Sequence, residues 1–154
     1  MLGGALLALA PSAATAAERS DVEQLEHLLA LERRLESAYA TALRRGAIDP
    51  SLGESLLAQE REHVRGLEQA LRGSGRREPR AVAPAPLPGT AASDRRAFAR
   101  FALDLEGQTV TAYLEVLATL GNERLLQPLG SIMASDAQHE VALRQALGLD
   151  LLGA

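Results

Sequence analysis

The chain has 154 residues, of which 47% are hydrophobic, 23% are charged and only 3% are aromatic, and its formal net charge is -4. This composition predicts one folded domain with an aliphatic core, and it excludes a disordered chain and a strongly basic nucleic-acid-binding protein. Because the chain has no cysteine, disulfides, thiolate metal sites and cysteine nucleophiles are excluded as well.

Residues 1–19 are similar to an export signal. An apolar stretch over 2–10 is followed by an Ala-rich run over 13–17, which resembles the apolar region and the cleavage site of a secretory signal peptide, although no basic residue precedes it. The stretch is too short to span a bilayer. We therefore expect residues 1–19 to be a signal-peptide remnant or a flexible arm, and the protein to be extracytoplasmic, either periplasmic or secreted.

Four segments carry apolar residues at the spacing of one helix face, so the sequence predicts an all-α fold with four helices. The expected starts are marked by N-cap residues or prolines, and the expected ends by glycines. In chain order, the pairs of start and end signals are the Ser20–Glu23 capping box with Gly46, Asp49–Pro50 with Gly73, Asp94 with Gly121, and Pro128 with Gly148. Pro128 either marks the true start of the fourth helix or kinks it early.

Segment 73–93 separates the second predicted helix from the third. It ends with Pro84, Pro86 and Pro88 at alternate positions, which exclude a helix and favour an extended chain. A segment of this length reaches up to roughly 70 Å, enough to run along a bundle. It is either a flexible linker between two hairpins or the long crossover of one antiparallel four-helix bundle over 20–148, with a tail at 149–154. We favour the bundle, because each hairpin is too small to fold alone.

One short motif occurs in both halves of the chain. Glu60 precedes His63 by three residues in the second predicted helix, and Asp136 precedes His139 by three in the fourth. A carboxylate and an imidazole at this spacing lie on the same face of a helix. A single pair of this kind is weak evidence, because it also arises as a solvated polar pair. Two copies in corresponding helices predict a metal site.

An acidic residue lies upstream of each motif, and a tyrosine follows it seven positions later: Glu32 with Tyr39, and Glu106 with Tyr113. At 100° per residue, the carboxylates and histidines of both halves fall within the apolar stripes of their helices. Counted from the expected turns, the four acidic residues lie about 15 to 23 Å along their helices, and therefore at a common depth. Unpartnered buried charges cost several kcal/mol each, so we expect positive ions between them.

The candidate metal ligands are four carboxylates and two histidines, namely Glu32, Glu60, His63, Glu106, Asp136 and His139. This donor set suits two Fe ions, with Mn as the alternative. Glu36 and Glu140 also face inward, and they either replace or supplement a ligand or pair with an arginine beside the stripe. Tyr39 and Tyr113 either donate hydrogen bonds to ligand carboxylates or act as redox-active catalytic residues.

These motifs resemble those of the ferritin-like superfamily, which includes ferritins, bacterioferritins and rubrerythrins, over about residues 20–148. The sequence is similar in particular to small exported ferritin-like domain proteins of bacteria, with Asp136 at a position where Glu is usual. The resemblance implies a dinuclear Fe or Mn protein that oxidises Fe(II) or scavenges peroxide, with O₂ or H₂O₂ as oxidant. The alternative is a ferritin-like module without catalysis, for binding, stress protection or metal sequestration.

Metal ions and O₂ or peroxide are therefore the expected small-molecule partners. The acidic net charge argues against a nucleic-acid partner, and no apolar stretch is long enough for stable membrane insertion. The third predicted helix has a second apolar side, formed by Leu103, Val110, Leu114 and Leu117. This side predicts a homodimer.

Overall fold

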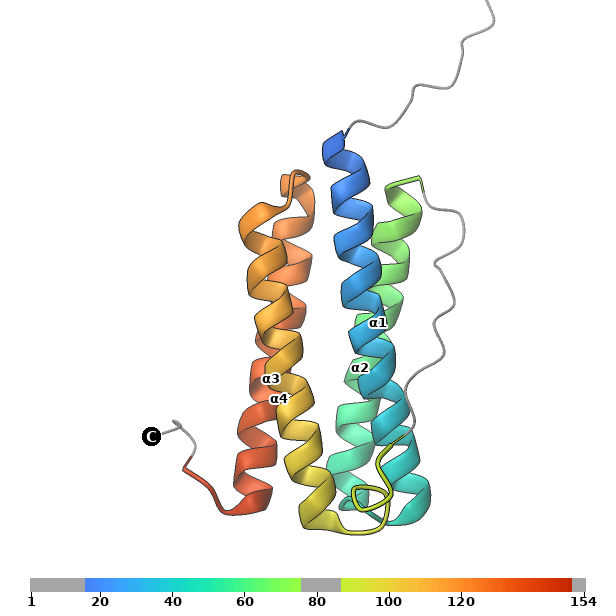
Figure 1. Cartoon of the computed structure of the whole chain (residues 1–154), viewed down its shortest axis with the longest axis vertical. Helices are drawn as coiled ribbons and strands as arrows, with labels where there is room; N and C mark the ends of the chain where they lie inside the picture. The colour runs from blue at the N-terminus through green and yellow to red at the C-terminus, as the bar shows by residue number, and fades with distance from the viewer. Residues whose placement is uncertain (1–15, 76–86, 151–154) are drawn as a thin grey trace, which may run out of the picture.

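The computed structural model of the chain describes residues 16–75 and 87–150, which form a four-helix bundle (Figure 1). α1 (Ala16–Arg45) and α2 (Pro50–Gly73) make one antiparallel hairpin. α3 (Arg95–Thr119) and α4 (Leu126–Leu147), joined through the short 3-10 helix η1 (Glu123–Leu125), make the other. The predicted all-α fold is confirmed, and the described ranges contain no strand.

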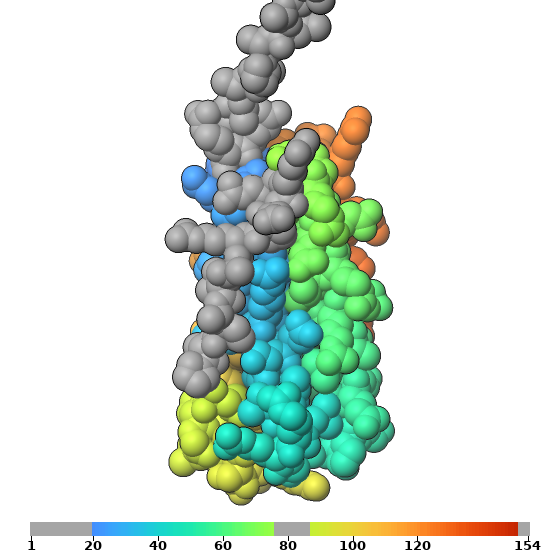
Figure 2. Space-filling view, turned by 90° about the vertical axis from the view of Figure 1, so that its right-hand side faces the viewer, coloured from blue at the N-terminus to red at the C-terminus, as the bar shows by residue number. Residues whose placement is uncertain are grey.

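The two hairpins are connected from opposite ends of the bundle. α2 ends at one end and α3 begins at the other, so these two helices run in the same direction (Figure 1). The described end of the connection, 87–94, lies beside the turn between α1 and α2 (Figure 2). There Ala91 and Ala92 are buried, and Nε of Arg95 donates to the backbone oxygen of Gly46 at 3.3 Å. The proline-rich run predicted to be extended falls mainly on 76–86, outside the described residues.

Most of the predicted helix boundaries agree with the structure. The side chains of Asp49 and Asp94 cap α2 and α3 by accepting hydrogen bonds from backbone N–H groups three residues later. Gly46 and Gly148 follow α1 and α4 with φ of 68° and 67°, a left-handed conformation that glycine adopts without strain. Pro128 lies in the first turn of α4, where its missing N–H has no helical partner to lose.

The predicted start of the first helix is wrong. α1 begins at Ala16, so Ser20 lies inside the helix and is not its N-cap. The physical reason is that the preceding residues, Ala, Ala, Glu and Arg, all have high helix propensity and extend the helix by about one turn. The predicted export segment otherwise falls on 1–15, outside the described residues, and export stays a prediction.

The core consists of two apolar clusters, one toward each end of the bundle. One cluster contains Leu35, Tyr39, Phe98, Leu105 and Leu143 among others. The second contains Leu25, Leu67, Leu71, Tyr113 and Leu129 among others. On every helix, the predicted ligand residues lie between the residues of these two clusters. The candidate site is therefore shielded by apolar packing above and below.

The outer side of α3 is only partly available to a partner. Leu114 is 55% exposed, whereas Leu103, Val110 and Leu117 are half-buried. The homodimer therefore stays a prediction. No helix in the described part of the chain combines the length and the apolarity needed to cross a membrane.

Asp21 ties the start of α1 to the turn between α3 and α4. Its side chain is buried, and its two oxygens accept hydrogen bonds from the backbone N–H groups of Gly121 and Asn122, each at 2.9 Å. A carboxylate in this position satisfies two N–H donors in the turn that follows α3.

We expect Asp21→Ala to lower the free energy of unfolding by about 1 to 3 kcal/mol, because both N–H groups lose their acceptor. Urea denaturation measures this loss. The exposed neighbour Glu23 gives the control variant Glu23→Ala, for which we expect a change of less than about 0.5 kcal/mol. Equal effects of the two substitutions would contradict the assigned role of Asp21.

Candidate metal centre

The six predicted ligand residues form one polar layer across the middle of the bundle. α1 contributes Glu32, α3 contributes Glu106, and α2 and α4 each contribute a carboxylate and a histidine. The four carboxylate residues are fully buried, and the two histidines are at most 7% exposed. We call these six residues the polar layer: Glu32, Glu60, His63, Glu106, Asp136 and His139.

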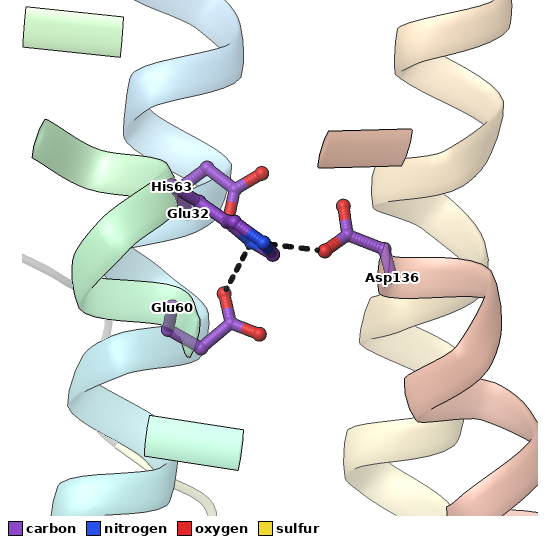
Figure 3. Close-up of side chains that lie close together, drawn as sticks. All are labelled: Glu32, Glu60, His63 and Asp136. Carbon is purple, nitrogen blue, oxygen red and sulfur yellow. Dashed lines mark ion pairs between the residues drawn. The ribbon is translucent and has the colours of Figure 1, made fainter. Parts of the chain in front are cut away.

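Three carboxylates surround one nitrogen of His63 (Figure 3). Its Nδ1 lies 3.1 Å from Oδ1 of Asp136, 3.3 Å from Oε2 of Glu32 and 3.7 Å from Oε2 of Glu60. Figure 3 shows His63 and Glu60 reaching from α2 toward Asp136 on α4. We call these four residues the His63 group. They converge on one point, as the ligands of a single ion would.

His139 is surrounded in the same way. Its Nδ1 lies 2.9 Å from Oε1 of Glu60, 3.3 Å from Oε1 of Glu106 and 3.9 Å from Oδ1 of Asp136. These residues form the His139 group. The rings of His63 and His139 are nearly parallel, with an interplanar angle of 19° and centroids 5.8 Å apart.

The two groups overlap in Glu60 and Asp136. Glu60 turns a different oxygen toward each histidine, and Oδ1 of Asp136 approaches both. Within each group, one candidate ligand atom per residue lies within 4.8 Å of all the others. Two ions held by these groups would therefore be neighbours with two carboxylates in common.

The polar atoms of the layer fit a metal better than they fit one another. One Nδ1 can donate only one hydrogen bond, so it cannot satisfy three carboxylates. In the described part of the chain, both Nδ1 atoms and six carboxylate oxygens have no hydrogen-bond partner. Arginines in the described part of the chain pair with glutamates outside the layer, such as Arg33 with Glu68 and Arg61 with Glu36. Buried polar atoms without partners are rare and costly, and cations would satisfy them.

Tyr39 and Tyr113 connect the hairpins through the outer carboxylates. The hydroxyl of Tyr39 donates to Oε1 of Glu106 at 2.5 Å, and that of Tyr113 donates to Oε1 of Glu32 at 2.6 Å. Burial, and then the nearby carboxylates, raise the pKa of both tyrosines well above the usual value. The hydroxyls therefore stay protonated and hold these carboxylates in place. Of the two roles considered from the sequence, this contact corresponds to hydrogen-bond donation to the candidate ligand carboxylates.

Before a metal binds, protons compensate the charge of the layer. Burial raises the pKa of Glu60 to about 7 and that of Asp136 to about 8, because desolvation outweighs the effect of the histidines. Burial also lowers the histidine pKa values, but the surrounding carboxylates outweigh it and raise them to about 12 for His63 and about 10 for His139. A metal ion has to displace these protons.

The two additional acidic candidates lie outside both groups. Glu36 pairs with Nε of Arg61 at 3.3 Å, near the surface. Glu140 is half-buried beside Gly107, and burial raises its pKa, although the charge of Arg144 opposes this shift. Neither belongs to the groups of convergent ligand atoms found in the described residues.

Sequence reasoning missed two polar residues that touch the layer. Gln59 and Ser135 lie next to Glu60 and Asp136, and both contact the ring of His139. Each lies four residues before a histidine, Gln59 before His63 and Ser135 before His139. This corresponding position in the two halves is the signal that could have identified them.

The fold and the polar layer together define a class: a four-helix bundle whose buried carboxylates and histidines can hold metal ions. The family model described as a ferritin-like domain matches residues 20–149, and the chain belongs to this family. The predicted membership of the ferritin-like superfamily is therefore confirmed. No curated protein and no solved structure matches the chain significantly.

Proposed function

We propose that this chain is a dinuclear Fe or Mn protein that oxidises Fe(II) or scavenges peroxide, using O₂ or H₂O₂ at the polar layer. The observation that supports this most is the overlap of the two groups in Glu60 and Asp136. Four carboxylates would offset the charge of two divalent ions, and each ion would have one histidine. Such a donor set favours Fe and Mn over metals that prefer thiolates or imidazoles alone.

The ions would supply one-electron chemistry. A pair of Fe(II) ions would provide the two electrons that, together with two protons, reduce H₂O₂ to two waters. The chain would contribute the rest: Tyr39 and Tyr113 orient the outer carboxylates, and the two apolar clusters keep bulk water away from the layer. The protons held by Glu60 and Asp136 before metal binding would leave as the ions bind.

The test begins with metal content. After anaerobic loading with Fe²⁺ and desalting, we expect about two Fe per chain in the wild type and none in the double variant His63→Ala/His139→Ala. His27, which is exposed on α1, gives the control His27→Ala, expected to keep both ions. The loaded wild type is then mixed with O₂ or H₂O₂, and consumption of the oxidant is followed together with the Fe(III) absorbance.

The outcomes separate the functions. Two ions that react with an oxidant would support the proposed oxidoreductase. Two ions that do not react would favour metal sequestration without turnover. A wild type that retains no metal would overturn the proposal.

A further inference from the structure

The second ring nitrogen of His139 contacts a glutamine across the bundle. Nε2 lies 3.2 Å from Oε1 of Gln59, and the hydroxyl of Ser135 donates to the same oxygen at 3.1 Å. Gln59 is on α2 and Ser135 on α4, so the three side chains connect these helices next to the polar layer. The contact places an acceptor against Nε2 while Nδ1 faces the carboxylates.

The orientation of the Gln59 amide follows from its other contacts. Its Nε2 lies 3.5 Å from the backbone oxygen of Ser55 and 3.4 Å from the hydroxyl of the same residue. A backbone carbonyl only accepts hydrogen bonds, so the NH₂ end of the amide belongs on that side. The oxygen end therefore faces His139, and Nε2 of this histidine carries a proton that it donates to this oxygen.

We propose that Gln59 is a positioning residue for one of the two metal positions. By accepting a hydrogen bond from Nε2–H of His139, it keeps a proton on Nε2 when the ion displaces the proton of Nδ1, so that the Nδ1 lone pair binds the metal. The His139 group is therefore preorganised, and it binds its ion more tightly than the His63 group. This inference rests on the proposed metal site, which it deepens.

His63 lacks this support. All its polar contacts in the described part of the chain go through Nδ1, and its side chain is slightly more exposed than that of His139. Ser135 corresponds in position to Gln59, but its side chain is shorter and its hydroxyl already donates to Gln59. The difference between the two metal positions thus comes from a glutamine in one half of the chain and a serine in the other.

The test compares variants of Gln59 that have a similar length and differ in whether they carry an oxygen that accepts the hydrogen bond from His139. Gln59→Met removes the acceptor, Gln59→Glu keeps an oxygen at this position, and Gln69→Met, at an exposed glutamine of the same helix, is the control. Zn²⁺ is titrated by calorimetry into the metal-free full chain, because it has no redox chemistry of its own. Thermal unfolding shows whether each variant is folded.

We expect two binding steps in the wild type, the tighter of which is lost in His139→Ala. Gln59→Met should weaken that step roughly 10- to 100-fold and leave the other step unchanged, as removal of a partner of a metal-bound histidine usually does. Gln59→Glu should restore the affinity, and Gln69→Met should bind like the wild type. A merely structural role of Gln59 would instead change both steps together.

A second readout reports on the tautomer directly. In the Zn²⁺-loaded protein, the ¹H–¹⁵N spectrum should show a slowly exchanging Nε2–H for His139 but not for His63, and Gln59→Met should abolish it. Unchanged affinity and an unchanged Nε2–H signal in Gln59→Met would overturn the inference and leave the metal site standing. A wild type that binds no Zn²⁺ and no Fe²⁺ would overturn the proposed function as well.

Discussion

At pH 9, the double variant Glu60→Gln/Asp136→Asn should be more stable than the wild type in the absence of metal, and it should bind no metal pair. Both wild-type carboxylates are ionised at this pH, because their pKa values are about 7 and 8. A buried carboxylate whose pKa is raised opposes folding, once it is ionised, by about 1.4 kcal/mol per pKa unit. The amides remove this charge and keep the shape of the side chains.

The expected gain is smaller than the sum of the two shifts. The two carboxylates interact with the same histidines, and the new amides still lack hydrogen-bond partners. We expect about 3 kcal/mol, which corresponds to a rise of roughly 6 to 12 °C in Tm. Fe²⁺ loading should fall from about two ions per chain to one or none, since both groups lose the carboxylates they have in common.

Thermal unfolding in the presence of a chelator and metal analysis after loading measure these two effects. Glu54 and Glu115 are exposed, so Glu54→Gln/Glu115→Gln changes the net charge equally without touching the layer. This control should change Tm by at most a few degrees and keep both ions. A double variant of the layer that is less stable than the wild type at pH 9 would show that the carboxylates serve folding rather than metal binding.

This opposition between stability and metal binding explains why the site could be found in the sequence. Residues buried in a protein core are usually apolar, so a carboxylate within an apolar stripe is an exception. Such exceptions are expected at functional sites. Glu32, Glu60, Glu106 and Asp136 all interrupt stripes whose other members are buried or partly buried in the structure. The repeated spacing to a histidine then indicated which chemistry would compensate them.

Helix starts and ends were predictable where one residue determines them. Asp49 and Asp94 cap their helices with their own side chains, and Gly46 and Gly148 adopt conformations that other residues avoid. The start of α1 was not predictable in this way. Its first turn contains several good helix formers, so the capping signal at Ser20 does not end the helix there.

Contacts between the hairpins could not be derived from spacing along one helix. The sequence places Tyr39 one and a half to two turns after Glu32, yet its hydroxyl bonds to Glu106 on α3, and Tyr113 bonds to Glu32 in return. The role of Asp21 depends on a turn about a hundred residues away in sequence. Such pairings depend on how the hairpins pack, which a helical pattern alone does not specify.

The pH dependence of stability should differ between the metal-free and the metal-bound protein. In the metal-free protein, the pKa values of Glu60, Asp136, His63 and His139 are all raised, so the folded chain binds more protons than the unfolded chain. Stability is then greatest below the unfolded pKa values and is lost as the pH rises through the folded ones. Between pH 5 and 9, the free energy of unfolding falls as the pH rises. The slope is about 1.4 kcal/mol per pH unit for each proton that the folded chain binds in excess of the unfolded chain.

Metal binding opposes this trend, because the ion needs deprotonated carboxylates and imidazoles free at Nδ1. Rising pH removes the competing protons, so the increase in Tm caused by Mn²⁺ should be small at pH 5 and large at pH 8. At pH 8, a Mn²⁺ concentration of about 1,000 Kd should raise the free energy of unfolding by about 4 kcal/mol. Tm measured from pH 5 to 9, with a chelator and with Mn²⁺, should give two curves that diverge as the pH rises. In Glu60→Gln/Asp136→Asn, the metal-free curve should be flatter and Mn²⁺ should have little effect. Parallel curves in the wild type would mean that metal binding displaces no protons, and the polar layer could not then be the place where the metal binds.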